Sequence, residues 1–148
     1  MDLDVAQLGK NEFFSHFTEP ELKKLLEHGN INRFQDNTAI FLQGDPGEAM
    51  YILLTGEVQI LLATKDGMEE IVATLKPGEL FGEGSFAANI PRSAKALSTR
   101  DSYVYVLTAD HLNDLIDREG TVAARLLNAV LNVVIDRLVI TNKRLASS

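Results

Sequence analysis

The chain has 148 residues, of which 21 are acidic and 14 basic, so its formal net charge at pH 7 is −7. Hydrophobic residues make up 45% of the sequence, which contains no cysteine. This composition is typical of one globular domain, and it excludes disulfides, thiolate zinc sites and cysteine nucleophiles. The net acidity also argues against a surface that coats the phosphates of nucleic acid, although it leaves room for a local basic pocket that binds a small anion.

The N-terminal residues, Met1-Asp2-Leu3-Asp4, have neither the basic nor the apolar region of a signal peptide. Apolar runs elsewhere in the chain are short and interrupted by polar residues, so none predicts a membrane-spanning helix. We therefore expect a soluble protein of the cytoplasm that has no membrane partner.

Residues 1–30 are predicted to form a helical lead-in. Between residues 13 and 28 apolar side chains recur at spacings of three to five, which predicts two short helices separated at Thr18-Glu19-Pro20. Thr18 is a typical N-cap and Pro20 suits a first helical turn, so the second helix is predicted to begin there and to end at Gly29.

Residues 31–107 carry short apolar segments at close spacing, which predict strands. The predicted strands cover residues 39–42, 50–54, 58–63, 70–75, 95–97 and 103–107. Four turn signals separate the earlier ones: Gly44-Asp45-Pro46-Gly47, Thr55-Gly56, Asp66-Gly67 and Pro77-Gly78. Asp66-Gly67 is the strongest hairpin signal, because both central positions of such a turn favour positive φ. The pattern indicates an α+β fold built on an antiparallel β-roll, or double-stranded jelly roll.

Residues 108–148 return to helical periodicity. Helices are predicted over residues 108–117 and 121–145, with Thr108 and Thr121 as N-caps and Gly120 between the two helices. The second helix carries an apolar seam with alternating spacings of three and four, formed by Ala124, Leu127, Leu131, Val134, Leu138, Thr141 and Leu145. A second apolar row beside it contains Leu126, Val130, Val133 and Ile140.

Two apolar rows on a helix of roughly 37 Å exceed what a small β-roll can cover. We therefore expect a homodimer that pairs through this helix, with the alternative that the helix wraps its own domain. Its polar stripe is narrow and contains Thr121, Arg125, Asn128, Asn132 and Asp136.

The segment at residues 81–94 has the composition of an anion site. Gly82 and Gly84 permit close approach of the backbone to a ligand, and the residues from Gly84 to Ala88 can form one helical turn whose free N–H groups attract an anion. Arg92 supplies a planar cation that suits phosphate oxygens. Glu83 accepts hydrogen bonds only, so it fits a ligand that also offers hydroxyl donors, such as a sugar phosphate.

This segment resembles the phosphate-binding cassette of the cyclic nucleotide-binding domain family. The resemblance rests on Glu83 and Arg92, nine positions apart, within Phe-Gly-Glu…Pro-Arg-Ser-Ala. It extends upstream through residues 40–45, 51–58 and 72–78, which are similar to the family's strands and turns in the same order. The resemblance implies one domain over residues 1–148, with the β-roll at 31–107, the cassette at 81–94 and C-terminal helices at 108–148.

By motif position, the resemblance implies that Glu83 and the Gly82 amide bind the ribose 2′-hydroxyl. Arg92 would bind the cyclic phosphate, together with the N–H groups of Ser85 and Ser93. The base would lie against the strand residues Ile60, Val72 and Ala73, and the long helix would cap it near Thr141 and Asn142.

Two positions depart from the family pattern. Gly84 stands where many relatives carry a bulky apolar residue after the glutamate. A glycine has no side chain to contact the C-terminal helix, so it does not support a relay from the cassette to that helix through apolar contacts. A hydroxyl at Ser93 can contact either the phosphate or a guanine amino group, so cyclic AMP is favoured over cyclic GMP but both remain candidates.

The sequence predicts a stand-alone cyclic nucleotide sensor in which ligand binding repositions the C-terminal helix and passes the signal to a downstream protein. The chain ends at Ser148 without a helix-turn-helix, so no direct DNA binding is expected. No catalytic pair or metal cluster stands out, and His16, His28 and His111 are far apart, so we expect neither an enzyme nor a cupin-like metal site. The alternatives are a ligand-free interaction or dimerisation module that keeps the fold, and a sugar-active jelly-roll enzyme.

Overall fold

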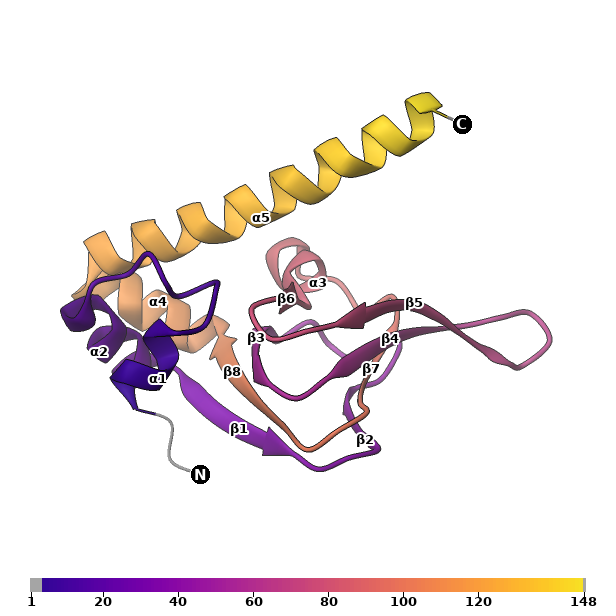
Figure 1. The fold of residues 1–148 in the computed structure, drawn as a ribbon, viewed down its shortest axis with the longest axis horizontal. Coiled ribbons are helices and arrows are strands. Elements are labelled where there is room, and N and C mark those ends of the chain that lie inside the picture. Colours follow the sequence, from indigo (N-terminus) through magenta and orange to yellow (C-terminus); the bar gives the residue numbers. More distant parts are fainter. Residues whose placement is uncertain (1–3, 148) are drawn as a thin grey trace.

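Helices at both ends of the chain flank two antiparallel sheets, as Figure 1 shows for a computed structural model that describes residues 4–147. The helices are α1 (Val5–Gly9), α2 (Glu19–His28), α3 (Glu83–Ala88), α4 (Ala109–Arg118) and α5 (Gly120–Ser147). The strands are β1 (Asn30–Phe34), β2 (Thr38–Phe41), β3 (Ala49–Thr55), β4 (Val58–Ala63), β5 (Glu69–Leu75), β6 (Leu80–Phe81), β7 (Lys95–Ser98) and β8 (Ser102–Thr108).

The strands form two four-stranded sheets in the orders β1-β8-β3-β6 and β2-β7-β4-β5. Every pairing in the two sheets is antiparallel. This arrangement confirms the predicted α+β fold with a β-roll. The predicted hairpin at Asp66-Gly67 joins β4 to β5, with Gly67 at φ +82°.

All six predicted strands are present, and the structure adds β1 and β6. Strand β1, with the sequence Asn-Ile-Asn-Arg-Phe, is largely exposed and has few apolar residues, whereas β6 has only two residues. Neither carries enough alternating apolar residues to be recognised from the sequence.

The two predicted helix starts at Thr18 and Thr108 are confirmed. Each threonine side chain accepts a hydrogen bond from the backbone N–H three residues later and forms a capping box, which satisfies free N–H groups at the helix start. Gly29 ends α2, as predicted.

Two predictions about helix positions are wrong. Residues 13–17 form turns instead of an α-helix: the N–H groups of Phe14 and Phe17 donate to carbonyls three residues earlier, whereas an α-helix uses the carbonyl four residues earlier. The first helix lies upstream, at α1. Gly120 is already helical, so Thr121 lies inside the first turn of α5 and is not its cap.

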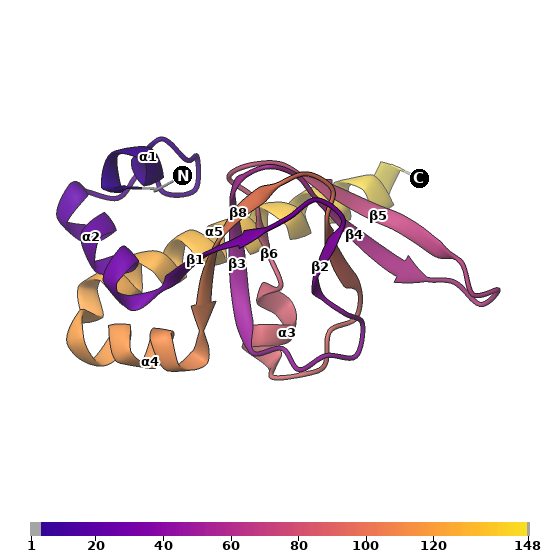
Figure 2. The same cartoon turned by 90° about the horizontal axis from the view of Figure 1, so that it is seen from below.

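The core has two parts. One lies between the two sheets and contains Leu53, Val58 and Val104, each 0% exposed. The other joins the first sheet to the helices through residues such as Phe14, Tyr105 and Leu126. Figure 2 shows α1, α2 and α4 gathered at one end of the roll, with the β4–β5 hairpin extending from the other end.

Helix α5 is buried only along its first part. Val122, Ala123 and Leu126 are buried, and Val130 and Val133 pack partly against the same core. Further along, Leu131, Leu138 and Leu145 of the predicted seam are 53%, 58% and 69% exposed. Figure 1 shows this part of α5 passing above α3, with its C-terminal end directed away from the sheets. No helix within residues 4–147 combines the length and apolar content needed to cross a bilayer.

Candidate functional site

The cassette lies between two strands and opposite α5. It leaves the first sheet at Phe81, the end of β6, forms α3, and then enters the second sheet at β7. Gly82 caps α3 with φ +76°, a left-handed conformation that an L side chain adopts at a cost of roughly 1–2 kcal/mol. A Cβ at Gly82 would also lie 2.9 Å from Arg92 Nη1, so a side chain at this position would require the guanidinium to shift.

Arg92 is the buried cation of the site, with only 3% of its surface exposed. Its Nη1 donates to the Gly82 carbonyl at 2.6 Å, and its Nη2 donates to the Ala49 carbonyl at 2.5 Å. Both acceptors are neutral, and Arg92 forms no ion pair within residues 4–147. The Arg92 Nε is buried without a hydrogen-bond partner in the same part of the chain.

Two aromatic rings flank this guanidinium. Arg92 Cζ lies 4.3 Å from the Phe41 ring centroid and 5.5 Å from that of Tyr51, distances at which the ring faces attract a cation. Burial raises the pKa of Tyr51, while the charge of Arg92 acts in the opposite direction. The rings hold the guanidinium in place, but they are neutral, and no carboxylate of the described residues forms an ion pair with it.

Glu83 lies at the start of α3 and forms an ion pair with α5. Arg137 Nη1 donates to Glu83 Oε1 at 3.0 Å, and Arg137 Nη2 donates to the Leu80 carbonyl at 2.6 Å. The resemblance predicts that α5 caps the ligand and that Glu83 binds its ribose, and here α5 is bonded directly to Glu83.

Arg137 lines the site although neither the sequence pattern nor the resemblance predicts it. It lies 54 positions from Glu83 in the chain, and only the fold brings the two together. The available signal was its place between Val133 and Ile140, where a cation interrupts the second apolar row of the helix.

A cavity of about 660 Å³ lies between the cassette, the strands and α5. It is lined by eight of the ten predicted site residues: Ile60, Ala73, Gly82, Glu83, Ser85, Arg92, Ser93 and Thr141. The remaining lining residues are Phe41, Leu75, Glu79, Leu80, Phe81, Gly84, Ala94, Arg137, Ile140 and Arg144.

Val72 and Asn142 lie outside this lining. Val72 is the extra residue of a β-bulge, between Ile71, which pairs with Leu61, and Ala73, which pairs with Ile60, and it is 52% exposed. Asn142 is exposed on α5, one position after Thr141. The Thr141 hydroxyl donates to the Arg137 carbonyl one turn earlier at 2.9 Å.

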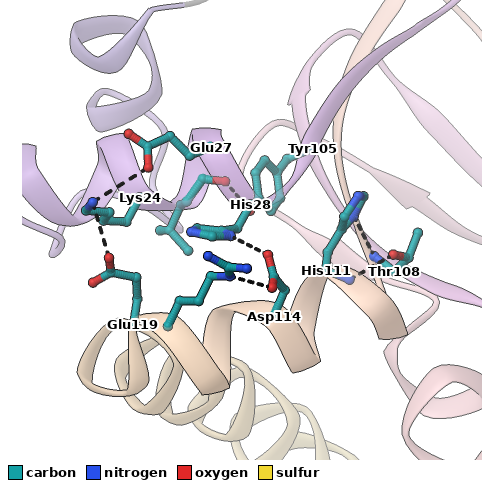
Figure 3. A network of polar contacts seen from close by, with 10 residues as sticks. Lys24, Glu27, His28, Tyr105, Thr108, His111, Asp114 and Glu119 are labelled. Atoms are coloured by element: carbon teal, nitrogen blue, oxygen red, sulfur yellow. Dashed lines mark hydrogen bonds and ion pairs between the residues drawn. The ribbon is translucent and has the colours of Figure 1, made fainter.

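The histidines lie away from the cavity and apart from one another. Figure 3 shows His28 of α2 beside Asp114 of α4, with Nδ1 and Oδ2 3.1 Å apart, and His111 beside Thr108 at the start of α4. His16 is exposed. Within residues 4–147 no three metal-ligating side chains form a cluster.

Comparison with known proteins agrees with this geometry. The family model described as the cyclic nucleotide-binding domain matches residues 31–119. A cyclic AMP receptor protein from Thermus thermophilus is 33% identical over 113 residues, which cover 76% of this chain and 52% of that protein. A cAMP-dependent protein kinase regulatory subunit from Yarrowia lipolytica is 31% identical over 96 residues, covering 65% and 25% of the two chains. This chain therefore spans about half, or less, of the length of these relatives.

Solved structures show the same fold. The N-terminal domain of a transcriptional regulator from Streptomyces coelicolor superposes with a TM-score of 0.74 and 28% identity, covering 95% of this chain and 96% of that one. A cyclic nucleotide-binding domain from Methylobacillus flagellatus gives a TM-score of 0.81 at 23% identity, covering 97% and 82%.

Proposed function

The chain belongs to the cyclic nucleotide-binding domain family, and from this premise we propose that it is a cyclic AMP sensor. In this proposal residues 1–148 act as one regulatory domain of the cytoplasm, without an enzymatic step and without direct DNA contact. Cyclic AMP is preferred to cyclic GMP. Ligand binding repositions α5, which passes the signal to another protein.

The observation that carries the proposal is the buried, uncompensated charge of Arg92. A buried cation is costly unless an anion and further hydrogen bonds accompany it. Among the residues that the structure describes, Arg92 donates hydrogen bonds to carbonyl oxygens only and its Nε has no hydrogen-bond partner, and it lines a cavity large enough for a small ligand. A cyclic phosphate supplies one negative charge and acceptor oxygens, which are what this guanidinium lacks.

The other polar groups of the cavity fit the rest of a nucleotide. Glu83 is a hydrogen-bond acceptor, which suits a ribose hydroxyl, and only its Oε1 is engaged by Arg137. Ile60 and Ala73, paired across β4 and β5, give an apolar surface for a base. Thr141 lies on the α5 side of the cavity, where it can cap that base. Asn142 lies on α5 and stays a predicted contact of a ligand-bound form in which α5 has moved. Val72 stays a predicted contact from the resemblance alone, because it lies on β5 and outside the cavity lining.

Calorimetric titration with cyclic AMP and cyclic GMP tests the proposal directly. Arg92→Ala leaves the phosphate without its cation, so we expect affinity to fall by roughly 2–5 kcal/mol, about 30-fold to several thousand-fold. Arg100→Ala removes the same charge from an exposed position after β7 and is the matched control. Unchanged binding by Arg92→Ala, in protein that unfolds like the wild type, would remove Arg92 from the site.

The exposed apolar row of α5 favours a second candidate, an interaction module that keeps the fold but binds no nucleotide. Thermal unfolding separates the two functions. Nucleotide at 100 times its Kd stabilises a true binder by about 2.7 kcal/mol, whereas the interaction module shows no response at any concentration. Product analysis after incubation with cyclic nucleotides would reveal any enzymatic turnover.

A further inference from the structure

The turn between β2 and β3, residues 42–48, is bonded to the backbone of Arg92 on both sides. The Gly44 N–H donates to the Arg92 carbonyl at 2.8 Å, and the Arg92 N–H donates to the Asp45 carbonyl at 2.7 Å. No residue of this turn lines the cavity. The main chain of the cationic residue is therefore held by a segment that a ligand in the cavity does not touch.

The residues directly before and after the turn hold the Arg92 side chain. Phe41 precedes the turn and places its ring 4.3 Å from Arg92 Cζ. Ala49 follows it and accepts a hydrogen bond from Arg92 Nη2. The segment from residue 41 to residue 49 thus contacts Arg92 through its backbone, its guanidinium plane and one guanidinium nitrogen.

Gly47 is the point where this turn meets the other half of the cassette. A Cβ at Gly47 would lie 2.6 Å from the Ser85 carbonyl oxygen and 2.7 Å from the Ile90 carbonyl oxygen. Both obstacles are backbone atoms, which cannot rotate away as a flexible side chain can. The end of α3 is therefore packed directly on the main chain of the turn, at a separation that only glycine permits.

We propose that the turn at residues 42–48 is a positioning element of the phosphate site, and that Gly47 sets the distance between α3 and Arg92. This inference rests on the proposed function, because it assigns the turn a role in nucleotide affinity. It depends on a general requirement: groups that converge on one small ligand must be held by their surroundings, since small displacements weaken several contacts together.

The first test is Gly47→Ala, measured by calorimetry with cyclic AMP. We expect affinity to fall by about 10- to 100-fold, the range typical when a group that orients a ligand-binding residue is altered at metal sites. Gly120→Ala is the control, because a Cβ at Gly120 meets no atom within 4 Å. Nucleotide affinity equal to the wild type in folded Gly47→Ala would overturn the proposal.

A double-mutant cycle tests whether Gly47 acts through Arg92. If it does, Gly47→Ala added to Arg92→Ala changes the affinity by less than about twofold, because the group it positions is already absent. A purely structural role predicts that the same loss recurs in both backgrounds, and that result would contradict the proposal.

Hydrogen exchange of the nucleotide-free protein separates this inference from the proposed function. The Arg92 amide is bonded to Asp45, so we expect it to exchange faster in Gly47→Ala than in the wild type, while exchange in the β3–β8 pair is unchanged. If the wild type binds no cyclic nucleotide, the sensor function fails, yet faster exchange still supports the positioning role. Unchanged Arg92 exchange would overturn it.

Asp45→Ala provides a second variant if Gly47→Ala does not fold. It removes the carboxylate that accepts the Leu42 N–H at 2.8 Å and shapes the turn, without adding an atom against α3. We expect faster Arg92 exchange and weaker nucleotide binding. Wild-type values for both measurements would contradict the proposal.

Discussion

Burying an arginine usually requires a counter-ion, because moving its charge out of water costs far more than neutral hydrogen bonds return. Arg92 is held instead by two carbonyl oxygens and two aromatic rings. These contacts fix its orientation without cancelling its charge. A site of this kind attracts an anion strongly, since the protein has already paid the cost of burying the cation.

At the residue scale, Gly82→Ala separates backbone strain from displacement of Arg92. The backbone at residue 82 has φ +76°, which an alanine adopts at a cost, so we expect the stability to fall by roughly 1–2 kcal/mol. The new Cβ would lie 2.9 Å from Arg92 Nη1, so we also expect a loss of nucleotide affinity. Urea unfolding and calorimetry measure the two effects.

Gly67→Ala is the matched control for this prediction. Gly67 has a similar φ of +82°, but a Cβ there meets no atom within 4 Å. It should therefore lose similar stability and keep its nucleotide affinity. Equal affinities in the two variants would show that Gly82 matters only for its backbone conformation.

At the scale of elements, polar contacts join the lead-in helix to the C-terminal helices. Lys24 of α2 pairs with Glu119, and His28 lies beside Asp114 of α4, as Figure 3 shows. Glu21 of α2 pairs with Arg125 of α5 at 3.0 Å. The first half of α5 is thereby tied to α2 and α4, while its second half extends over the cavity.

Glu21 gives this junction a pH dependence. The hydrogen bond from the Thr18 backbone, followed by contributions from the Thr18 side chain and Arg125, outweighs burial and holds the pKa of Glu21 below its ordinary value of 4.5. A lowered pKa stabilises the folded state above the unfolded pKa, and this contribution disappears as the pH falls through the folded pKa. We expect Glu21→Gln to reduce the loss of stability on acidification below about pH 4.5, measured by urea unfolding. An identical acid dependence in the variant would contradict this prediction.

The second half of α5 depends on Arg137. Because Arg137 bonds to both Glu83 and the Leu80 carbonyl, we expect Arg137→Gln to increase hydrogen exchange over residues 137–147 in the nucleotide-free protein. Arg144→Gln removes the same charge from the same helix and cavity lining and serves as the control. Equal exchange in the two variants would assign the position of α5 to other contacts.

At the scale of the whole molecule, α5 carries an exposed apolar surface that departs from ordinary burial. Leu127, Leu131, Val134, Ile135 and Leu138 are 38–58% exposed, which is costly for a helix that faces only water. Such a surface suits a second copy of the same helix, in agreement with the homodimer that we predict.

Leu131→Asp tests that homodimer by sedimentation. The substitution places a charge in the middle of the seam, so we expect the wild type to sediment as a dimer and the variant as a monomer. Asn132→Asp adds the same charge one residue later on the polar stripe and should leave the dimer intact. A persistent dimer in Leu131→Asp would place the interface elsewhere.

The cassette containing Glu83 and Arg92 was predicted from its resemblance to a known family. Local sequence alone was sufficient for six of the strands, the caps at Thr18 and Thr108 and the Asp66-Gly67 hairpin. Each of these depends on residues close together in the chain, whose spacing reflects the geometry of one strand, turn or helix end. The exposed strand β1, the two-residue strand β6 and the turns at residues 13–17 escaped prediction because their apolar patterns are weak or ambiguous.

Only the tertiary structure determined how the site is held together. Arg92 bonds to Ala49, 43 positions away, and Glu83 pairs with Arg137, 54 positions away. Gly47 meets Ser85 and Ile90 across a similar separation in sequence. These contacts depend on the order in which strands are paired and on the direction in which α5 leaves the roll. Periodicity within a single element carries no information about either, so the partners of Arg92 and Glu83 could be found only after the sheets were assembled.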